Sequence, residues 1–329
     1  MKKKTSGWKA FSFVMTVAIA FAFWMPTTGW GAQQSYPAGP IDVIVPYVPG
    51  GGTDLTARVF AEPLLNKWKK PVNVVNKPGG NLVIGTNYVM QAAPDGYTIL
   101  LDGGSSSSLQ VIMPNLPYKV ENRTFLACGS AMPTVYVVKA DSPWKTLADV
   151  AAAVKKDPGN FTWASHGGAT QTDVAMRQFF AATGVDIAKT KPIIFSGGGA
   201  SFNAVSGGHV QLAAAGAATG VPLKSSGLIR CLAVTSSQRL KEWPDVPTTM
   251  EQGFPSLNLV MWLGFSGPPG IPDDIKKIWA QTIKELTSDP KVIAKLEKIV
   301  SVPMYLGPDE FRKYVLDECE QVKHWLGGK

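Results

Sequence analysis

Cysteine and histidine are scarce, with three of each among 329 residues. Cys128, Cys231 and Cys319 lie far apart in the sequence, so at most one disulfide bond can form among them. Neither residue type shows the close spacing that a metal site requires. We therefore expect no metal ion and no other cofactor, and we interpret the cysteines as small buried residues.

Long apolar runs are equally rare, and the longest lies at the N-terminus. It extends from Ala10 to about Met25, follows four lysines and precedes small and polar residues. This order is typical of a cleaved secretory signal peptide, which we place at residues 1–32. The run is short for a membrane span, so an uncleaved anchor is the less favoured alternative. We expect the mature chain outside the cytoplasm.

Excess charge is small once this segment is removed. The segment holds four lysines and no acid, so the net charge falls from +8 to +4. No block of lysine and arginine and no alternation of basic with aromatic residues survives, so no nucleic acid partner is expected. A weakly positive field favours small anions instead.

Strand-like and helix-like runs alternate along the mature chain. The first apolar runs are IDVIVPYV, PVNVVNK and YTILLDGG, and helices are expected over residues 53–69 and near 86–93. Pro63 predicts a kink or a break in the first of these helices. Apolar strands that alternate with helices need cover on both faces of a parallel sheet, so the pattern predicts an α/β fold.

A second alternating set follows, from TVYVVK to IRCLAVTS, with helices expected at residues 147–156, 170–183 and 201–206. The run LNLVMWLGFSG predicts a further strand, and two helices are expected to end the chain. The last helix carries an apolar stripe that indicates core packing, formed by Phe311, Tyr314, Val315, Val322, Trp325 and Leu326.

Three predicted strand-to-helix junctions are rich in glycine: PGGGTD, SHGGATQTD and SGGGAS. The start of a helix presents unpaired N–H groups and the positive end of the helix dipole, and glycine lets a ligand approach this backbone closely. In parallel sheets such junctions line the crevice at the carboxyl ends of the strands. The three turns together predict a shared anion-binding crevice, although any one alone could be a plain tight turn.

Nucleotide-binding motifs do not fit these glycines. A P-loop requires a lysine that follows neither Gly50–Gly52 nor Gly197–Gly199 at the correct spacing. A dinucleotide-binding turn requires a third glycine where Leu55 stands.

Catalysis also finds little support. No G-x-S-x-G elbow surrounds the serines at 105–108. His166 and Asp173 could meet across the second junction, and we interpret them as polar lining rather than as a catalytic pair. Asp54 is expected to stabilise the first turn of its helix. A secreted hydrolase that uses Ser105 or His166 remains the alternative from a different functional class.

Six motifs together resemble a known family: YPAGPIDVIVPYVPGGGTDLTAR, KPGGN, AAPDGYTILL, LAVTSSQR, PDVPTTMEQGF and GPPGIP, in that order. The chain resembles the Bug family of periplasmic binding proteins, the substrate-binding component of tripartite tricarboxylate transporters. The resemblance implies a periplasmic, monomeric, non-enzymatic protein that binds a small organic carboxylate and delivers it to the membrane subunits of the transporter. A binder of an aromatic acid, an amide or a sugar acid that serves a sensor is the alternative.

The same resemblance implies a two-lobed periplasmic-binding-protein type II fold. Each lobe is expected to contain a mainly parallel sheet flanked by helices, with the ligand cleft between the lobes. Residues 33–104 plus 256–329 would form lobe 1, and residues 105–255 would form lobe 2.

Similar proteins hold a carboxylate, often through ordered waters, between the first glycine turn and the turn that opens the lobe 2 helix. The far end of the ligand is expected near the third turn and Met261–Leu263. Carried over by position, the resemblance and the glycine turns give these candidate ligand-binding residues: Tyr47, Val48, Gly50, Gly51, Gly52, Thr53, Asp54, Ser165, His166, Gly167, Gly168, Ala169, Thr170, Gln171, Gly198, Gly199, Ala200 and Ala215.

Two departures from the family pattern fall where the far end of the ligand is expected. Asp173 stands where histidine is common, and His166 is an additional histidine. Gln211 and Ala215 replace two common aspartates. Without these carboxylates an amino group has no evident partner, so amino acids are expected to bind poorly, and the ligand is expected to have a neutral far end.

Overall fold

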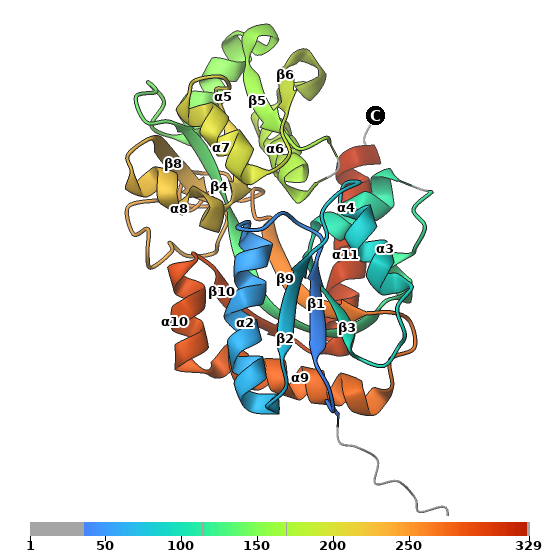
Figure 1. Ribbon diagram of the computed structural model, residues 1–329. Coiled ribbons are helices and arrows are strands. Elements are labelled where there is room, and N and C mark those ends of the chain that lie inside the picture. Colours follow the sequence, from blue (N-terminus) through green and yellow to red (C-terminus); the bar gives the residue numbers. More distant parts are fainter. Residues whose placement is uncertain (1–35, 114, 169, 328–329) are drawn as a thin grey trace, which may run out of the picture. The chain divides into compact units, whose positions relative to one another are not determined.

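One long strand, β4 (Thr124–Lys139), hydrogen-bonds to four other strands in the computed structural model, which describes residues 36–113, 115–168 and 170–327 (Figure 1). Its first part pairs antiparallel with β9 (Val260–Gly267) and β10 (Val302–Leu306). Its last residues pair antiparallel with β7 (Ala213–Gly216) and β8 (Ile229–Val234). The strand is buried almost throughout because apolar residues occupy both of its faces.

The larger sheet continues beyond β9 with parallel strands. Its order is β10-β4-β9-β3-β1-β2, where β1 (Ile41–Val45) pairs in parallel with β2 (Val72–Asn76) and β3 (Thr98–Gly103). α2 (Gly52–Trp68) and α3 (Val83–Met90) connect these strands. The pairs that involve β4 and β9 are antiparallel, so the sheet is mixed rather than mainly parallel as predicted. The direction of a strand depends on the path of the whole chain, which the local apolar pattern does not record.

A second set of elements packs around the C-terminal part of β4. β5 (Thr162–Ser165) pairs in parallel with β6 (Lys191–Ile194). The helices are α5 (Leu147–Lys156), α6 (Gln171–Thr183), α7 (Gly198–Ser206) and α8 (Ala217–Ser225), with short 3-10 helices at Val120–Asn122, Pro158–Asn160 and Ile187–Lys189. One core cluster here includes Tyr136, Trp163, Phe179 and Phe180. The predicted helices at 147–156 and 170–183 are confirmed, to within one residue.

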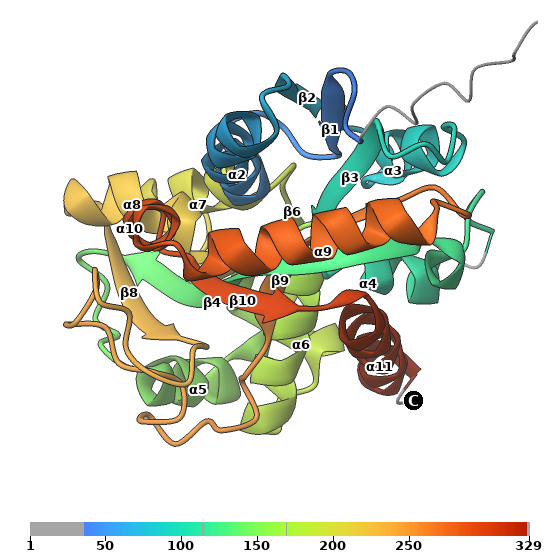
Figure 2. The ribbon, with the colours of Figure 1, turned by 90° about the horizontal axis from the view of Figure 1, so that it is seen from below.

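The C-terminal region contains three helices, not the two predicted: α9 (Asp273–Ser288), α10 (Pro290–Lys298) and α11 (Pro308–Gly327). Figure 2 shows α9 lying along β4 and β10. α11 buries Phe311, Val315 and Val322, as its stripe predicted, and packs against α4 (Ser105–Ile112), which the sequence did not predict. The side chains of Trp325 and Leu326 lie outside the described part of α11.

α2 runs without a break through Pro63, because its buried face, which includes Phe60 and Leu64, is held by packing. The three cysteines are free, and Cys128 and Cys319 are buried. The predicted signal peptide at residues 1–32 lies outside the described residues. Among residues 36–327 that the structure describes, no helix combines the length and the apolar character needed to cross a membrane.

Candidate functional site

The helices around the glycine turns each follow a strand along the chain: α2 follows β1, α4 follows β3, α6 follows β5, α7 follows β6 and α8 follows β7. The backbone N–H of Gln171, the first residue of α6, donates to the Ser105 hydroxyl at the start of α4 (3.3 Å). A Cβ atom built on Gly52, the first residue of α2, would lie 3.7 Å from the Cβ of Ala218 in α8. The start of α6 therefore adjoins that of α4, and the start of α2 adjoins that of α8.

Two methionines connect these neighbouring helix starts. A Cβ atom on Gly52 or on Gly216 would overlap the side chain of Met132, which is buried in β4. A Cβ atom on Gly103, at the end of β3, would lie 3.0 Å from the Cγ of Met261. The same Met261 side chain would lie 3.6 Å from a Cβ on Gly216. Glycine at these positions thus lets the helix starts approach a common apolar surface.

The first glycine turn is held by Asp54, in the first turn of α2. Asp54 Oδ2 accepts the N–H of Gly50 (2.9 Å), and Oδ1 accepts a hydrogen bond from Asn76 Nδ2 (3.0 Å). Arg58 Nε donates to Oδ2 and its Nη2 lies beside Oδ1, both at 3.0 Å. Gly50 has a φ of +79°, which favours glycine. Asp54 lies in the first turn of α2, as predicted, although the helix has no side-chain cap.

The electrostatics of Asp54 agree with this structural role. Burial by itself would raise the pKa of Asp54, but hydrogen bonds from Arg58, Gly50 and Asn76 outweigh it and hold the pKa below its usual value. The carboxylate is therefore charged and its two oxygens are already occupied by four donors. Such a carboxylate organises the turn, and the paired guanidinium of Arg58 offsets its negative charge.

The second glycine turn is held in the same way by Asp173, also in the first turn of its helix. Its Oδ1 accepts the Ser165 hydroxyl (2.7 Å) and the His166 N–H (2.9 Å). Its Oδ2 accepts the N–H (3.1 Å) and the hydroxyl (2.8 Å) of Thr170. Gly167 and Gly168 between them have positive φ angles of 93° and 80°. Ala169 lies outside the described residues.

His166 and Asp173 meet, but through the backbone of His166 and not through its ring. The ring Nδ1 lies 2.7 Å from the hydroxyl of Thr172, and Nε2 lies 3.4 Å from the hydroxyl of Ser201 in α7. Burial lowers the pKa of His166, although the charge of Asp173 opposes this. The ring therefore joins the second glycine turn to the third as polar lining.

The helix starts differ in how many N–H groups remain available. In α2 the N–H groups of Gly52 and Thr53 find no acceptor among the described residues, and in α7 the same holds for Gly198, Gly199 and Ala200. In α6 the groups are largely used, because a capping box joins Thr170 and Asp173 and the Gln171 N–H donates to Ser105. The prediction of bare N–H groups therefore applies to α2 and α7 but not to most of α6.

The third glycine turn lies against Ala215. A Cβ atom on Gly198 would lie 2.9 Å from the Cβ of Ala215, which is buried in β7. Gln211, in contrast, accepts the N–H of Thr162 (2.8 Å), the first residue of β5. The third turn follows the last residue of β6, which runs parallel to β5, so Gln211 lies at the opposite end of these two strands and not beside the turn, where it was predicted. Gln211 precedes β7, so its side chain lies away from the carboxyl ends of the strands.

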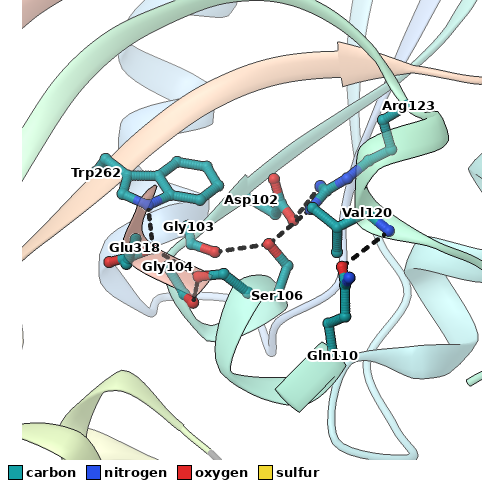
Figure 3. Close-up of polar contacts among 10 residues, drawn as sticks. Asp102, Gly103, Gly104, Ser106, Gln110, Val120, Arg123, Trp262 and Glu318 are labelled. Carbon is teal, nitrogen blue, oxygen red and sulfur yellow. Dashed lines mark hydrogen bonds and ion pairs between the residues drawn. The ribbon is translucent and has the colours of Figure 1, made fainter. Parts of the chain in front are cut away.

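A buried polar cluster supports the start of α4 (Figure 3) and extends to Gln171 at the start of α6. Arg123 Nη1 pairs with Asp102 Oδ2 (2.8 Å), and both side chains are 1% exposed. Glu318 of α11 accepts hydrogen bonds from Ser107 (2.5 Å) and Trp262 (2.7 Å), and from Gln171 at 3.5 Å. Burial raises the pKa of Glu318 to about 7, although the bonds from Ser107 and Trp262 oppose this.

Tyr47 is a second candidate residue beside this cluster, in addition to Gln171. Burial raises the pKa of Tyr47, and the side chain of Ser105 lies near enough to oppose the shift. Val48, by contrast, is 55% exposed. These two candidates are adjacent in the sequence, but Tyr47 lies beside the polar cluster and Val48 lies in solvent.

Sequence reasoning missed Met132 and Glu318. Neither lies in a glycine-rich motif, and both come from elements far along the chain from the turns they contact. The only available signal for Glu318 was its position in the sequence, since it is an acidic residue between Val315 and Val322 of the apolar stripe. Within the residues that the structure describes, no three histidine, cysteine, aspartate or glutamate side chains gather where they could hold a metal ion.

Residues 56–326 match the family described as Tripartite tricarboxylate transporter family receptor, TctC. The chain belongs to this family. Its members are receptors, so this TctC receptor is a binding protein and not an enzyme. The match confirms the resemblance that the six motifs indicated.

Individual relatives support the assignment of this TctC receptor. It is 32% identical over 300 residues to Protein BugT of Bordetella pertussis, covering 90% of both chains. The solved structure of the periplasmic binding protein BugD is 26% identical with a TM-score of 0.78, over 88% of this chain and 97% of that one. The structure of an R. palustris protein with adipate is 23% identical with a TM-score of 0.82, over 89% and 98% of the chains. The receptor therefore has the α/β periplasmic-binding-protein fold.

Proposed function

We propose that this receptor acts in the periplasm, where it binds a small organic carboxylate and delivers it to the membrane subunits of a tripartite tricarboxylate transporter. Two lobes, residues 33–104 plus 256–329 and residues 105–255, would close over the ligand. The family, the periplasmic relative BugD and the dicarboxylate in the R. palustris structure support this proposal.

The observation that carries the proposal is the pair of open helix starts at α2 and α7. Gly52, Thr53, Gly198, Gly199 and Ala200 offer N–H groups that no described residue accepts. Each charge-assisted bond to a carboxylate contributes about 1.5–3 kcal/mol. Micromolar binding requires about 8 kcal/mol, which three or four such bonds and the exclusion of water can supply. No side-chain cation is then needed.

The second glycine turn contributes side chains more than N–H groups. Ser165, His166, Thr170 and Gln171 would line the ligand, with Gly167, Gly168 and Ala169 allowing its approach. Tyr47, Val48, Gly50, Gly51 and Asp54 would shape the first turn. Ala215 and the methionines at 132 and 261 would face the far end of the ligand with apolar surface.

An amino group finds no acceptor of suitable charge in this arrangement. Four donors already occupy Asp54, and four occupy Asp173. A ligand ammonium would lose its hydration without a free carboxylate in return, which is costly. We infer that the far end of the ligand is neutral.

A calorimetric screen tests this function directly. Adipate, malate, benzoate, aspartate and glutamate are titrated into the receptor, with adipamide as a neutral control for the acid group. At least one of the three simple acids is expected to bind with micromolar affinity, and adipamide is not. Micromolar binding of aspartate or glutamate, or tighter binding of adipate than of benzoate, would contradict the neutral far end, and binding of adipamide alone would contradict carboxylate recognition.

The part played by the main chain is tested at Gly199, where a Cβ atom meets nothing within 4 Å. Gly199→Ala keeps the N–H group, whereas Gly199→Pro removes it within the first turn, where proline is tolerated. The proline variant is expected to bind the acid about ten- to a hundredfold more weakly than the alanine variant. Equal affinities would show that this N–H group does not hold the ligand.

A further inference from the structure

Four side chains of the second glycine turn form a continuous chain of hydrogen bonds. His166 Nδ1 lies 2.7 Å from Thr172 Oγ1, which lies 2.8 Å from Thr170 Oγ1. Thr170 Oγ1 in turn lies 2.8 Å from Asp173 Oδ2. Each threonine has one hydroxyl hydrogen to donate, so the protons along this chain can be assigned.

The assignment starts at Asp173. Both of its oxygens accept backbone N–H groups, from His166 and from Thr170, so it is a carboxylate and can only accept. The Thr170 hydroxyl therefore donates to Asp173, and the Thr172 hydroxyl must donate to Thr170. Thr172 then has no hydrogen left for the imidazole, so His166 Nδ1 carries the proton and donates to Thr172. In the neutral ring, Nε2 carries the lone pair.

The partner of Nε2 in the structure is weak. Ser201 Oγ lies 3.4 Å away, and the Ser201 hydroxyl donates instead to the carbonyl of Gly198 at 2.8 Å. Ser201 belongs to the first turn of α7, whose open N–H groups at Gly198, Gly199 and Ala200 lie directly before it. Nε2 therefore presents an acceptor beside a row of donors.

A ligand hydroxyl matches this arrangement, because it can donate to Nε2 and accept from an N–H group. A second carboxylate would bring a lone pair against Nε2 unless the ring took up a proton. Burial disfavours the charged ring, and Asp173, the one charged side chain among the described residues that bears on it, does not overcome this effect. An ammonium group needs several acceptors, and one imidazole nitrogen supplies a single one.

We propose that His166 Nε2 accepts a hydrogen bond from a hydroxyl group on the bound acid, and that His166 thereby makes the receptor select hydroxy acids. This inference rests on the proposed function, since it assigns a ligand contact within the carboxylate site. Asp173, Thr170 and Thr172 are positioning residues, which hold the ring in the tautomer that makes Nε2 an acceptor.

Matched pairs of acids that differ by one hydroxyl group test this role by titration calorimetry. The pairs are malate with succinate, lactate with propionate, and mandelate with phenylacetate. In at least one pair the hydroxy acid is expected to bind about tenfold more tightly. Equal binding within every pair would overturn the role of His166 and leave carboxylate binding intact, whereas no binding of any acid would contradict the proposed function itself.

Two variants connect the preference to this ring. His166→Asn keeps a donor near Nδ1 for Thr172 but lacks Nε2, so the two acids of the preferred pair are expected to bind alike. His209→Asn, at an exposed histidine, is the control and is expected to keep the preference. A preference that persists in His166→Asn would overturn the proposal.

The proton positions can be measured directly. Nitrogen-15 spectra of the ring at pH 7 are expected to show the proton on Nδ1, and a proton on Nε2 in the neutral ring would overturn the assignment. Titrations of the preferred hydroxy acid in buffers of different ionisation enthalpy are expected to show no proton uptake at pH 7. Uptake of one proton for each bound acid would show that the ring binds a carboxylate as a cation instead.

Discussion

Asp173→Asn should reveal how strongly the second glycine turn depends on one buried carboxylate. The side chain of Asp173 keeps its size in this variant, but one oxygen becomes an NH₂ group. Asp173 accepts the N–H of His166 at one oxygen and the N–H of Thr170 at the other. In either orientation of the asparagine, one backbone N–H therefore faces another donor. The neighbouring hydroxyls can rotate, but a backbone N–H cannot.

The cost follows from the burial of these groups. Asp173 is 1% exposed, so the N–H group that loses its acceptor is largely withdrawn from water. An unsatisfied buried donor costs about 1–3 kcal/mol, and the lost negative charge at a helix start adds about 0.3–1 kcal/mol. We expect the free energy of unfolding to fall by about 1.3–4 kcal/mol.

Urea unfolding measures this loss, and α5 provides a matched control. Thr146 and Asp149 form the same capping box at the start of α5 as Thr170 and Asp173 form at the start of α6. Asp149 is exposed, so Asp149→Asn is expected to cost clearly less, because water can take the place of the lost acceptor. If Asp173→Asn destabilises the receptor no more than Asp149→Asn does, the buried carboxylate does not hold the turn.

Three further changes follow from the site. The folded pKa of Glu318 is about 7 and its ordinary value is 4.5, so the stability that Glu318 contributes is full below pH 4.5 and is lost as the pH rises through 7. The unfolding free energy of Glu318→Gln should therefore rise by up to about 3 kcal/mol relative to that of the wild type between pH 5 and 8. Plots of unfolding free energy against pH that run parallel for the two proteins would contradict this. In Gly52→Ala the new Cβ would overlap the side chain of Met132, so the affinity for the acid should fall. Adding Met132→Ala should restore part of this affinity. An unchanged affinity in Gly52→Ala would refute the role of the close approach between Gly52 and Met132. Since the folded pKa of Asp54 is lowered, its contribution is present above pH 3.8 and is lost as the pH falls through the folded value, so Asp54→Asn should flatten the acid limb of the unfolding free energy against pH.

The glycine turns show how much of the structure can be predicted from residues that are close together in the sequence. Asp54 lies four residues from Gly50, and Asp173 lies three from Thr170, so the bonds that close both turns are formed within one short segment. Helix positions were predictable for the same reason, as at 147–156, where the capping box and the apolar spacing are local. Pro63 shows the limit of such reasoning, because α2 continues through it without the break that was one of the two predicted outcomes.

The contacts among the turns could not be predicted from any one segment. Glu318 lies 147 residues from Gln171, and the Ser105 hydroxyl that accepts the Gln171 N–H lies 66 residues away. No alternation of apolar residues records such a pairing, since it depends on how the strands are ordered and directed. The position of Gln211 was wrong for the same reason, because its distance from the glycine turn depends on which end of β5 it meets.

The amino-acid sequence by itself determined where α2, α5 and α6 begin, which turns need glycine and which aspartates close the first two of them, because these features depend on backbone angles and on hydrogen bonds between near neighbours. Only the tertiary structure decided that α2 and α7 keep their N–H groups open while α6 gives its own to Ser105 and to its capping box. Only the fold set Met132 against the start of α2 and the ring of His166 beside α7. These outcomes follow from the order of strands in the sheet, which brings together residues that no local pattern connects.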